Sequence, residues 1–227
     1  MNQEELKKYC ELIIEVGVNL YPEQCLNINC GIKNYEFALL LAETAYKKGA
    51  KFVDFKTGSS KLTKNRIQYN SNPEDLEFIP SYLHARTNEM LANDWAFVSV
   101  DNLEEIDVLK EVDPGKFGTM IKKEQEAFKS MSKAFGSSKN PWTIVAAPGP
   151  AWASKVFNKP DLSEKNTEDL WKKLVPILRL DKKDPVEEWR LHGNKLVERS
   201  RILTEMKLDK LLFEGPGTEL EIGLNKN

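Results

Sequence analysis

The sequence has few of the residues on which metal and nucleophile sites most often depend. It contains two histidines, His84 and His192, and three cysteines, Cys10, Cys25 and Cys30, in 227 residues. The histidines lie far apart in the chain and outside any HExxH pattern, so no sequence feature joins them into a zinc site. The cysteines are odd in number and show no CxxC spacing, which favours reduced thiols. We therefore expect the histidines on helix surfaces and the cysteines as small core residues.

Excess charge and long apolar runs are also lacking. Lys and Arg total 33 against 35 Asp and Glu, for a formal net charge of −2, which argues against nucleic acid or an anionic membrane as a partner. No apolar run approaches the roughly 18–20 residues that span a bilayer, and the acidic residues near the N-terminus are untypical of a signal peptide. With 41% hydrophobic and 30% charged residues, the composition is typical of an ordinary soluble globular protein. The reduced thiols favour a cytoplasmic location.

Phosphate-binding motifs are missing as well. Gly58-Ser59-Ser60-Lys61 lacks the GxxxxGK[ST] spacing that wraps phosphates, and Cys30-Gly31-Ile32 stands where a dinucleotide-binding domain would have GxGxxG. The acidic pairs Glu104-Glu105 and Glu187-Glu188 fall on polar faces of predicted helices, where we expect them to be solvated. Residue types alone therefore predict a Rossmann-like domain with no visible catalytic centre.

Alternation of strands and helices dominates the first two thirds of the chain. Short apolar or alternating runs predict strands at Leu26–Cys30, Lys51–Phe55, Trp95–Val100 and Trp142–Ala147. Helical spacing predicts helices at 4–20, 34–48 (between an Asn34 N-cap and a Gly49 C-cap), 73–93 (irregular at Pro80), 104–111 and 116–135. The polar stretch 57–72 is assigned no element. This order predicts a parallel sheet of about four strands, covered by helices on both faces.

The pattern changes after Phe157. A helix is predicted at Thr167–Leu178, and Asp184-Pro185 is a helix start from which a long helix runs to about Lys207. Leu208–Leu224 predicts a β-hairpin that turns at Gly215-Pro216-Gly217. Since two strands alone are marginally stable, we expect the hairpin to begin a further sheet. The expected division is an α/β domain at 1–160, a helical segment at 161–207 and a hairpin at 208–227.

The loop Pro148-Gly149-Pro150 is the first candidate for a functional site. It follows the predicted strand Trp142–Ala147 and precedes a helix that opens at about Ala151. Ligands in open α/β sheets usually bind at the carboxyl ends of strands, and the two prolines make this loop rigid. A rigid strand–helix connection with no ligand is the other interpretation.

Three blocks of the sequence are distinctive: Pro148–Phe157 (PGPAWASKVF), Asp184–Trp189 (DPVEEW) and Phe213–Leu224 (FEGPGTELEIGL). Together they resemble the aminopeptidase T family, the thermophilic leucine aminopeptidases of metallopeptidase family 29. An AWA-x-KVF block after a buried strand, followed by a GPGT-x-L-x-x-GL hairpin, is a specific combination. The resemblance covers Met1 to Leu224.

The resemblance implies an exopeptidase that removes N-terminal amino acids from peptides with two divalent metal ions, zinc, cobalt or manganese. In that family the metal ligands follow the GPGT hairpin. No residue of this sequence is therefore assigned as catalytic or metal-binding, and no metal is expected on this chain.

The resemblance also implies an amino-terminal domain that covers the active-site cleft of its own carboxyl-terminal catalytic domain. On that basis Pro148, Gly149, Pro150 and Trp152 are candidates for lining the cleft. For Trp152, packing into the core is an equal alternative, because aromatic side chains bury large areas.

Two other interpretations stay open. The chain could be a small-molecule or nucleotide-binding module that acts alone, because fold does not fix function. It could also be a structural or docking domain, since the free edge of the terminal hairpin is suited to pairing with another chain. The same edge predicts self-association into a homodimer.

Overall fold

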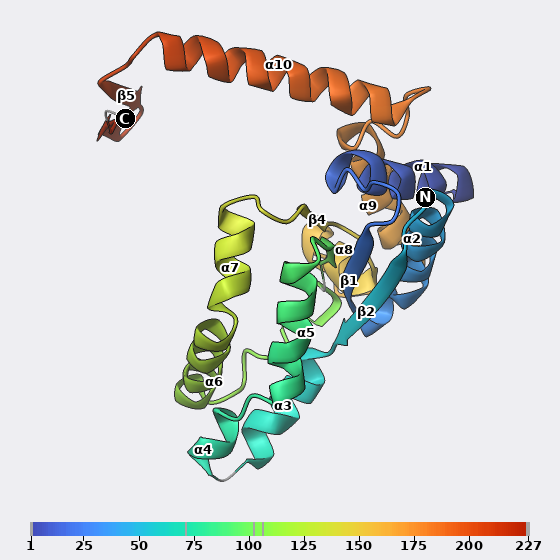
Figure 1. Ribbon diagram of the computed structural model, residues 1–227, viewed down its shortest axis with the longest axis vertical. Coiled ribbons are helices and arrows are strands. Elements are labelled where there is room, and N and C mark those ends of the chain that lie inside the picture. Colours follow the sequence, from blue (N-terminus) through green and yellow to red (C-terminus); the bar gives the residue numbers. More distant parts are fainter. Residues whose placement is uncertain (1, 71, 102, 106, 226–227) are drawn as a thin grey trace. The chain divides into compact units, whose positions relative to one another are not determined.

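The computed structural model describes residues 2–70, 72–101, 103–105 and 107–225 (Figure 1). Contacts divide the chain into two units, Met1–Val186 and Glu187–Asn227. Among the helices described, none is both long enough and apolar enough to cross a lipid bilayer. The division at 160 and 207 expected from the sequence stays a prediction.

A four-stranded parallel sheet forms the centre of the first unit. Its strands are β1 (Cys25–Gly31), β2 (Phe52–Gly58), β3 (Ala96–Val100) and β4 (Trp142–Val145), in the order β2-β1-β3-β4. All the pairings are parallel, so the chain must cross over between strands, and helices make these crossovers. The predicted α/β class and all four predicted strand positions are confirmed.

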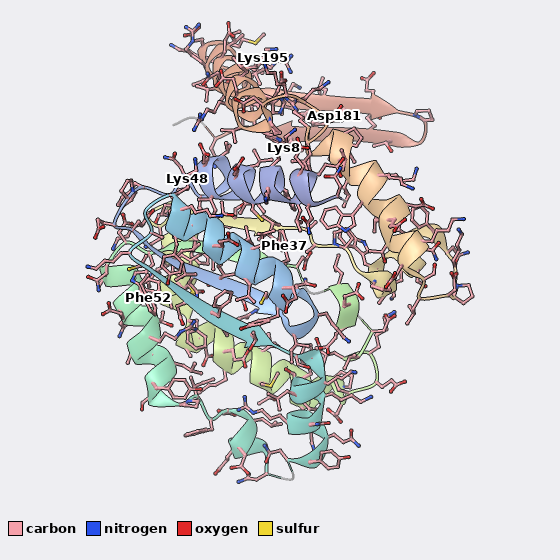
Figure 2. All side chains as sticks on the ribbon, turned by 90° about the vertical axis from the view of Figure 1, so that its right-hand side faces the viewer. Lys8, Phe37, Lys48, Phe52, Asp181 and Lys195 are labelled. Atoms are coloured by element: carbon pink, nitrogen blue, oxygen red, sulfur yellow. The ribbon has the colours of Figure 1, made fainter. Side chains whose placement is uncertain are left out.

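One face of the sheet carries a closely packed apolar core. Here α1 (Gln3–Leu12) packs on α2 (Tyr35–Lys47), while α2 contacts β1 and β2 and the π-helix Ile13–Gly17 contacts β4. Figure 2 shows α2 beside the sheet, between Lys48 at its end and Phe37 nearer its start. Leu26 and Ile28 on β1, which alternate along the strand, are completely buried. This is the burial that strand periodicity predicts for one sheet face.

The opposite face is covered by α5 (Ser81–Ala92) and α7 (Lys129–Gly136) (Figure 1). Met90, Trp95 and Phe97 form the buried cluster on this side. Because β4 is the last strand, its Trp142 and Ile144 remain 43% and 63% exposed. The predicted cover of helices on both faces of the sheet is therefore incomplete at β4.

A smaller cluster lies apart from the sheet. It joins α3 (Ser60–Tyr69), α4 (Pro73–Leu76) and α6 (Pro114–Ala127) through Ile67, Leu76 and Met120. Arg66 Nη2 closes α4 by donating to the carbonyl oxygens of Asp75, Leu76 and Phe78, at 2.9–3.1 Å. The sequence did not predict α3, because Ile67 is its only buried residue and so leaves no apolar stripe.

Three predicted helices differ from the observed ones. The helix at 73–93 is divided into α4 and α5 before Pro80, because proline restricts the preceding residue and lacks an N–H. The helix at 116–135 is divided into α6 and α7 at Phe128, which has φ −107° and ψ 23°. The predicted helix at 104–111 is a 3-10 turn at Leu103–Glu105 followed by further turns, and Ile106 lies outside the described residues.

The helices α8 (Pro150–Phe157) and α9 (Glu164–Ile177) pack on each other in the first unit. The second unit holds most of α10 (Pro185–Glu205) and an antiparallel hairpin of β5 (Lys210–Gly215) and β6 (Thr218–Gly223). Gly217 has φ +73° in the two-residue turn, a conformation that glycine adopts readily. The predicted long helix and hairpin are confirmed.

Candidate functional site

A hollow of about 590 Å³ lies at the carboxyl edge of the sheet, beside the loop between β4 and α8. Its walls include Pro148, Gly149 and Pro150 from the loop, and side chains from α1, α2 and α9. Three of the four sequence candidates therefore line one cavity. Trp152 is half-buried in the first turn of α8 and is not among the described residues that line the hollow.

The carboxylate of Glu104 caps α8 from a distant part of the chain. Its Oε2 accepts a hydrogen bond from the N–H of Ala151 at 3.0 Å, and its Oε1 accepts one from Trp152 at 3.1 Å. The first N–H groups of a helix have no partner inside the helix, and negative charge near them is favourable. Since Gly149 is the N-cap and has no side chain, Glu104 takes the part that a capping side chain would play.

Gly149 is required because Glu104 approaches it so closely. A Cβ on Gly149 would lie 2.5 Å from the carboxyl carbon of Glu104 and 2.7 and 2.9 Å from its oxygens, well inside van der Waals contact. The backbone at Gly149 has φ −125°, which any residue can adopt. Space for the carboxylate, rather than conformational freedom, therefore accounts for this glycine.

Glu105 adds to the cap of a second helix, α3, whose own N-cap Ser59 accepts a hydrogen bond from the N–H of Lys61 at 3.2 Å. The side chain of Glu105 is buried and accepts hydrogen bonds from the N–H of Ser60 at 2.5 Å and from Ser59 Oγ, at the start of α3. The expectation that the Glu104-Glu105 pair is solvated is therefore wrong. The pair lies in the 3-10 turn Leu103–Glu105 a few residues after β3, and these two neighbouring carboxylates reach the N-termini of two different helices. The one sequence signal for this arrangement was the Gly149-Pro150 helix start, which offers no local capping side chain.

Tyr9 ties α1 to the end of β4 next to the hollow. Its hydroxyl donates to the carbonyl oxygen of Ala146 at 3.0 Å, and its ring packs on Phe37 and edge-on to Trp171. Burial raises the pKa of Tyr9 above its usual range. Burial, followed by the nearby charge of Glu11, raises the pKa of the Cys10 thiol to about 12. Both groups are therefore neutral near pH 7 and have structural roles.

Asn34 connects the first crossover to the same edge. It stands at the N-cap position of α2, as the sequence predicts, but its side chain makes no capping hydrogen bond. Its Nδ2 donates instead to the carbonyl oxygen of Asp101 at 3.1 Å, just past β3. Asn34 thus fixes the end of β1 against the end of β3.

The ligand chemistry of the described residues is limited. In the part of the chain that the structure describes, no three His, Cys, Asp or Glu side chains are grouped so that they could hold a metal ion. His84 is exposed on α5 and stacks on Phe128, and His192 lies on α10 beside Trp189. All three cysteines are free thiols.

The fold and the site define the class of domain to which the chain belongs. It is an α/β domain in which helix caps fix the loops at the carboxyl edge of the sheet. The chain belongs to the thermophilic metalloprotease family M29, whose family model matches residues 2–227. It is 35% identical over 217 residues to aminopeptidase 2 of Geobacillus stearothermophilus, and the match covers 95% of this chain and 51% of the relative. It is 31% identical over 225 residues to aminopeptidase PepS of Streptococcus thermophilus, covering 99% and 54% of the two chains.

The solved structure of wild-type AmpT from Thermus thermophilus is also similar. It has a TM-score of 0.86 and 29% sequence identity to this chain, and the match covers 98% of this chain and 54% of that one. The chain thus spans about half the length of the relatives it matches. The resemblance noted from three sequence blocks is confirmed.

The close approach of Gly149 and Glu104 predicts a coupled pair of substitutions. We expect Gly149→Ala to lower the free energy of unfolding by about 1–2 kcal/mol, because the new Cβ displaces the carboxylate that caps α8. In a Glu104→Ala background, the same substitution should cost much less, since the clash is gone. Urea unfolding of the four proteins measures both values.

Gly118→Ala is the matched control. A Cβ at Gly118, inside α6, meets no atom within 4 Å, so alanine should stabilise the protein by up to about 1 kcal/mol through helix propensity. An equal cost of Gly149→Ala with and without Glu104 would contradict the proposed role of this glycine.

Proposed function

We propose that this chain forms the amino-terminal, non-catalytic part of a metal-dependent aminopeptidase that removes N-terminal amino acids from peptides. The observation that carries the proposal is that nearly the whole chain matches about half of proteins named as aminopeptidases. Peptide hydrolysis would then belong to the full-length enzyme. The three free thiols suit a reducing cytoplasm, which is where we place the enzyme.

We propose metal ions only because the chain belongs to a metalloprotease family. A metalloprotease needs a set of protein ligands for its ions, and the described residues hold no suitable group of three. The described residues therefore do not fit a two-metal centre, and no step of hydrolysis is derived from them. In the proposal, two zinc, cobalt or manganese ions bind to residues of the carboxyl-terminal catalytic domain.

The second unit supports a role in contacting that catalytic domain. Its hairpin exposes large apolar side chains on both strands, including Phe213 at 50% and Leu220 at 48%. An isolated two-stranded hairpin is marginally stable, and apolar side chains gathered on a surface often mark an interaction site. We propose that the chain's own catalytic domain covers the hairpin. In a homodimer, a second copy would cover it instead.

The loop Pro148–Trp152 is the part of the first unit that we assign to the substrate cleft. Two prolines and the Glu104 hydrogen bonds hold it rigid, and a rigid wall can limit which peptides enter without ordering cost. In this role the loop contacts substrate residues beyond the first, through Pro148, Gly149, Pro150 and Trp152. The chain then limits access to the active site and supplies no catalytic group.

A chimera tests the proposed function. Residues 1–227 would replace the matched part of aminopeptidase T of Thermus thermophilus, to which the chain is 31% identical over 220 residues. We expect metal-dependent hydrolysis of leucine p-nitroanilide by the chimera and none by the 227-residue chain, whatever divalent metal is added. The carboxyl-terminal part of the relative alone serves as the control.

Two results would contradict this function. One is metal-dependent activity in the 227-residue chain alone, after which His84 and His192 would be the first residues to mutate. The other is a folded, metal-loaded chimera that hydrolyses no aminopeptidase substrate.

Trp152 provides the test of the cleft assignment. In the active chimera, we expect Trp152→Ala to change KM for peptides of several residues by about tenfold, the effect of losing one apolar contact, with a smaller change for leucine p-nitroanilide. Phe78→Ala, which removes an aromatic side chain that is 66% exposed outside the hollow, is the control. Unchanged KM and kcat for both substrates would rule out a cleft role for Trp152.

A further inference from the structure

The sheet face beneath α5 and α7 carries two rows of side chains that run across the strands. The strand register aligns Asp54, Asn27, Phe97 and Trp142 in one row, and Lys56, Asn29, Ser99 and Ile144 in the next. Residues two apart on a strand point to the same side of a sheet, so the two rows share one face. This face is opposite to the apolar core formed with α2.

A hollow of about 350 Å³ lies between these rows and the two helices. Figure 1 shows α5 and α7 over this part of the sheet, and their contribution to the lining includes Arg86, Met131 and Phe135. The volume is within the range of about 300–1,000 Å³ that is typical of small-molecule sites. It is separate from the hollow at the Pro148 loop, since the two have no described lining residue in common.

One end of the hollow is aromatic. Phe135 stacks on Trp142 with ring centroids 5.7 Å apart, and meets Phe97 edge-on at 5.0 Å. Ile144 extends this wall and is 63% exposed on the edge strand. These side chains offer an apolar surface that a ligand could cover, since exposed apolar area is the part of a site that gains most from burial.

The other end of the hollow is polar and has unused hydrogen-bonding capacity. The side chains of Asn29, Lys56 and Ser99 line it, the first two exposed and the third half-buried. In the described part of the chain, these three side chains make no hydrogen bond or ion pair with another residue. They come from neighbouring strands in one row, so their polar groups lie side by side at this end of the hollow. A small number of polar groups beside an apolar wall is the usual pattern of a binding pocket.

The charged side chains at the hollow favour an anionic ligand. Arg86 donates through Nε at 2.9 Å and Nη2 at 2.5 Å to the same Oδ2 of Asp54, so these two charges balance each other. Among the described residues that line the hollow, Lys56, two residues further along β2, is the remaining cation. A single cation matches a group with one negative charge, whereas a phosphate monoester carries nearly two at neutral pH.

We propose that this hollow binds a small carboxylate with an apolar body. The ring or branched chain lies against Phe135, Trp142 and Ile144, and the carboxylate accepts hydrogen bonds from Lys56, Asn29 and Ser99. The inference is independent of the proposed aminopeptidase function, because it rests only on the residues beneath α5 and α7.

The test uses 3-phenylpropionate as the probe and the 227-residue chain, with binding followed by calorimetry. We expect saturable binding, and binding of the neutral 3-phenylpropanamide that is at least about tenfold weaker, because a charged hydrogen bond is lost. Lys56→Ala should weaken binding of the carboxylate by about the same factor. Ile144→Glu should weaken it too, since it puts a negative charge at the exposed apolar rim.

Each variant has a matched control outside the hollow. Lys51→Ala removes another exposed lysine, and Ile32→Glu changes an isoleucine that is 62% exposed, against 63% for Ile144. Both should bind the probe like the unmodified chain. Circular dichroism of all variants separates loss of binding from loss of fold.

Three outcomes would overturn the proposal. One is the absence of saturable binding tighter than about 1 mM. Another is equal weakening by Lys56→Ala and Lys51→Ala, which would place the probe elsewhere. The third is stronger binding of phenyl phosphate or a nucleotide than of the carboxylate, which would assign the hollow to phosphate ligands.

Discussion

The carboxylates of Glu104 and Glu105 hold the carboxyl edge of the sheet together. They lie just beyond the end of β3, one of the two inner strands, and accept hydrogen bonds from the first N–H groups of α8 and α3, which have no partner inside their helices. Each cap typically contributes about 0.5–2 kcal/mol to stability. Their more important effect is to fix where the two helices begin. One short turn fixes both the β4–α8 loop and the start of the outer helix cluster.

The two faces of the sheet differ in polarity, as the side chains of strand β1 show. Leu26 and Ile28 face the buried core with α2, whereas Asn27 and Asn29 face α5 and α7. Parallel strands that are packed on both sides usually read as continuous apolar runs. The alternation in β1 therefore indicates that the second face does more than pack, which is why a ligand is proposed there.

The sequence predicts those elements that local patterns determine. The four strands, α2 with its Gly49 end, the long helix from Asp184-Pro185 and the terminal hairpin all carry clear periodicity or turn signals. Helix α3 was missed because its only buried side chain is Ile67, and the exposed edge position of β4 depends on sheet order, which no local pattern reveals.

The candidate site could be predicted only in part, because the contacts that shape it join residues far apart in the sequence. The loop Pro148-Gly149-Pro150 was found because strand and turn signals mark it. The hydrogen bonds that shape it join residues 47 and 48 positions apart, and a pair of neighbouring glutamates looks the same in sequence whether solvated or capping. The cross-strand row of Lys56, Asn29 and Ser99 likewise exists only once the register is known.

The central claim is that the hairpin of β5 and β6 is completed by the catalytic part of an aminopeptidase. Amide hydrogen exchange at Leu212, Phe213 and Leu220, compared between the 227-residue chain and the chimera with the relative's carboxyl-terminal part, tests it most directly. The account predicts fast exchange in the chain alone and strong protection in the chimera, with β1 amides protected in both. Equal exchange of the hairpin amides in the two proteins would contradict it.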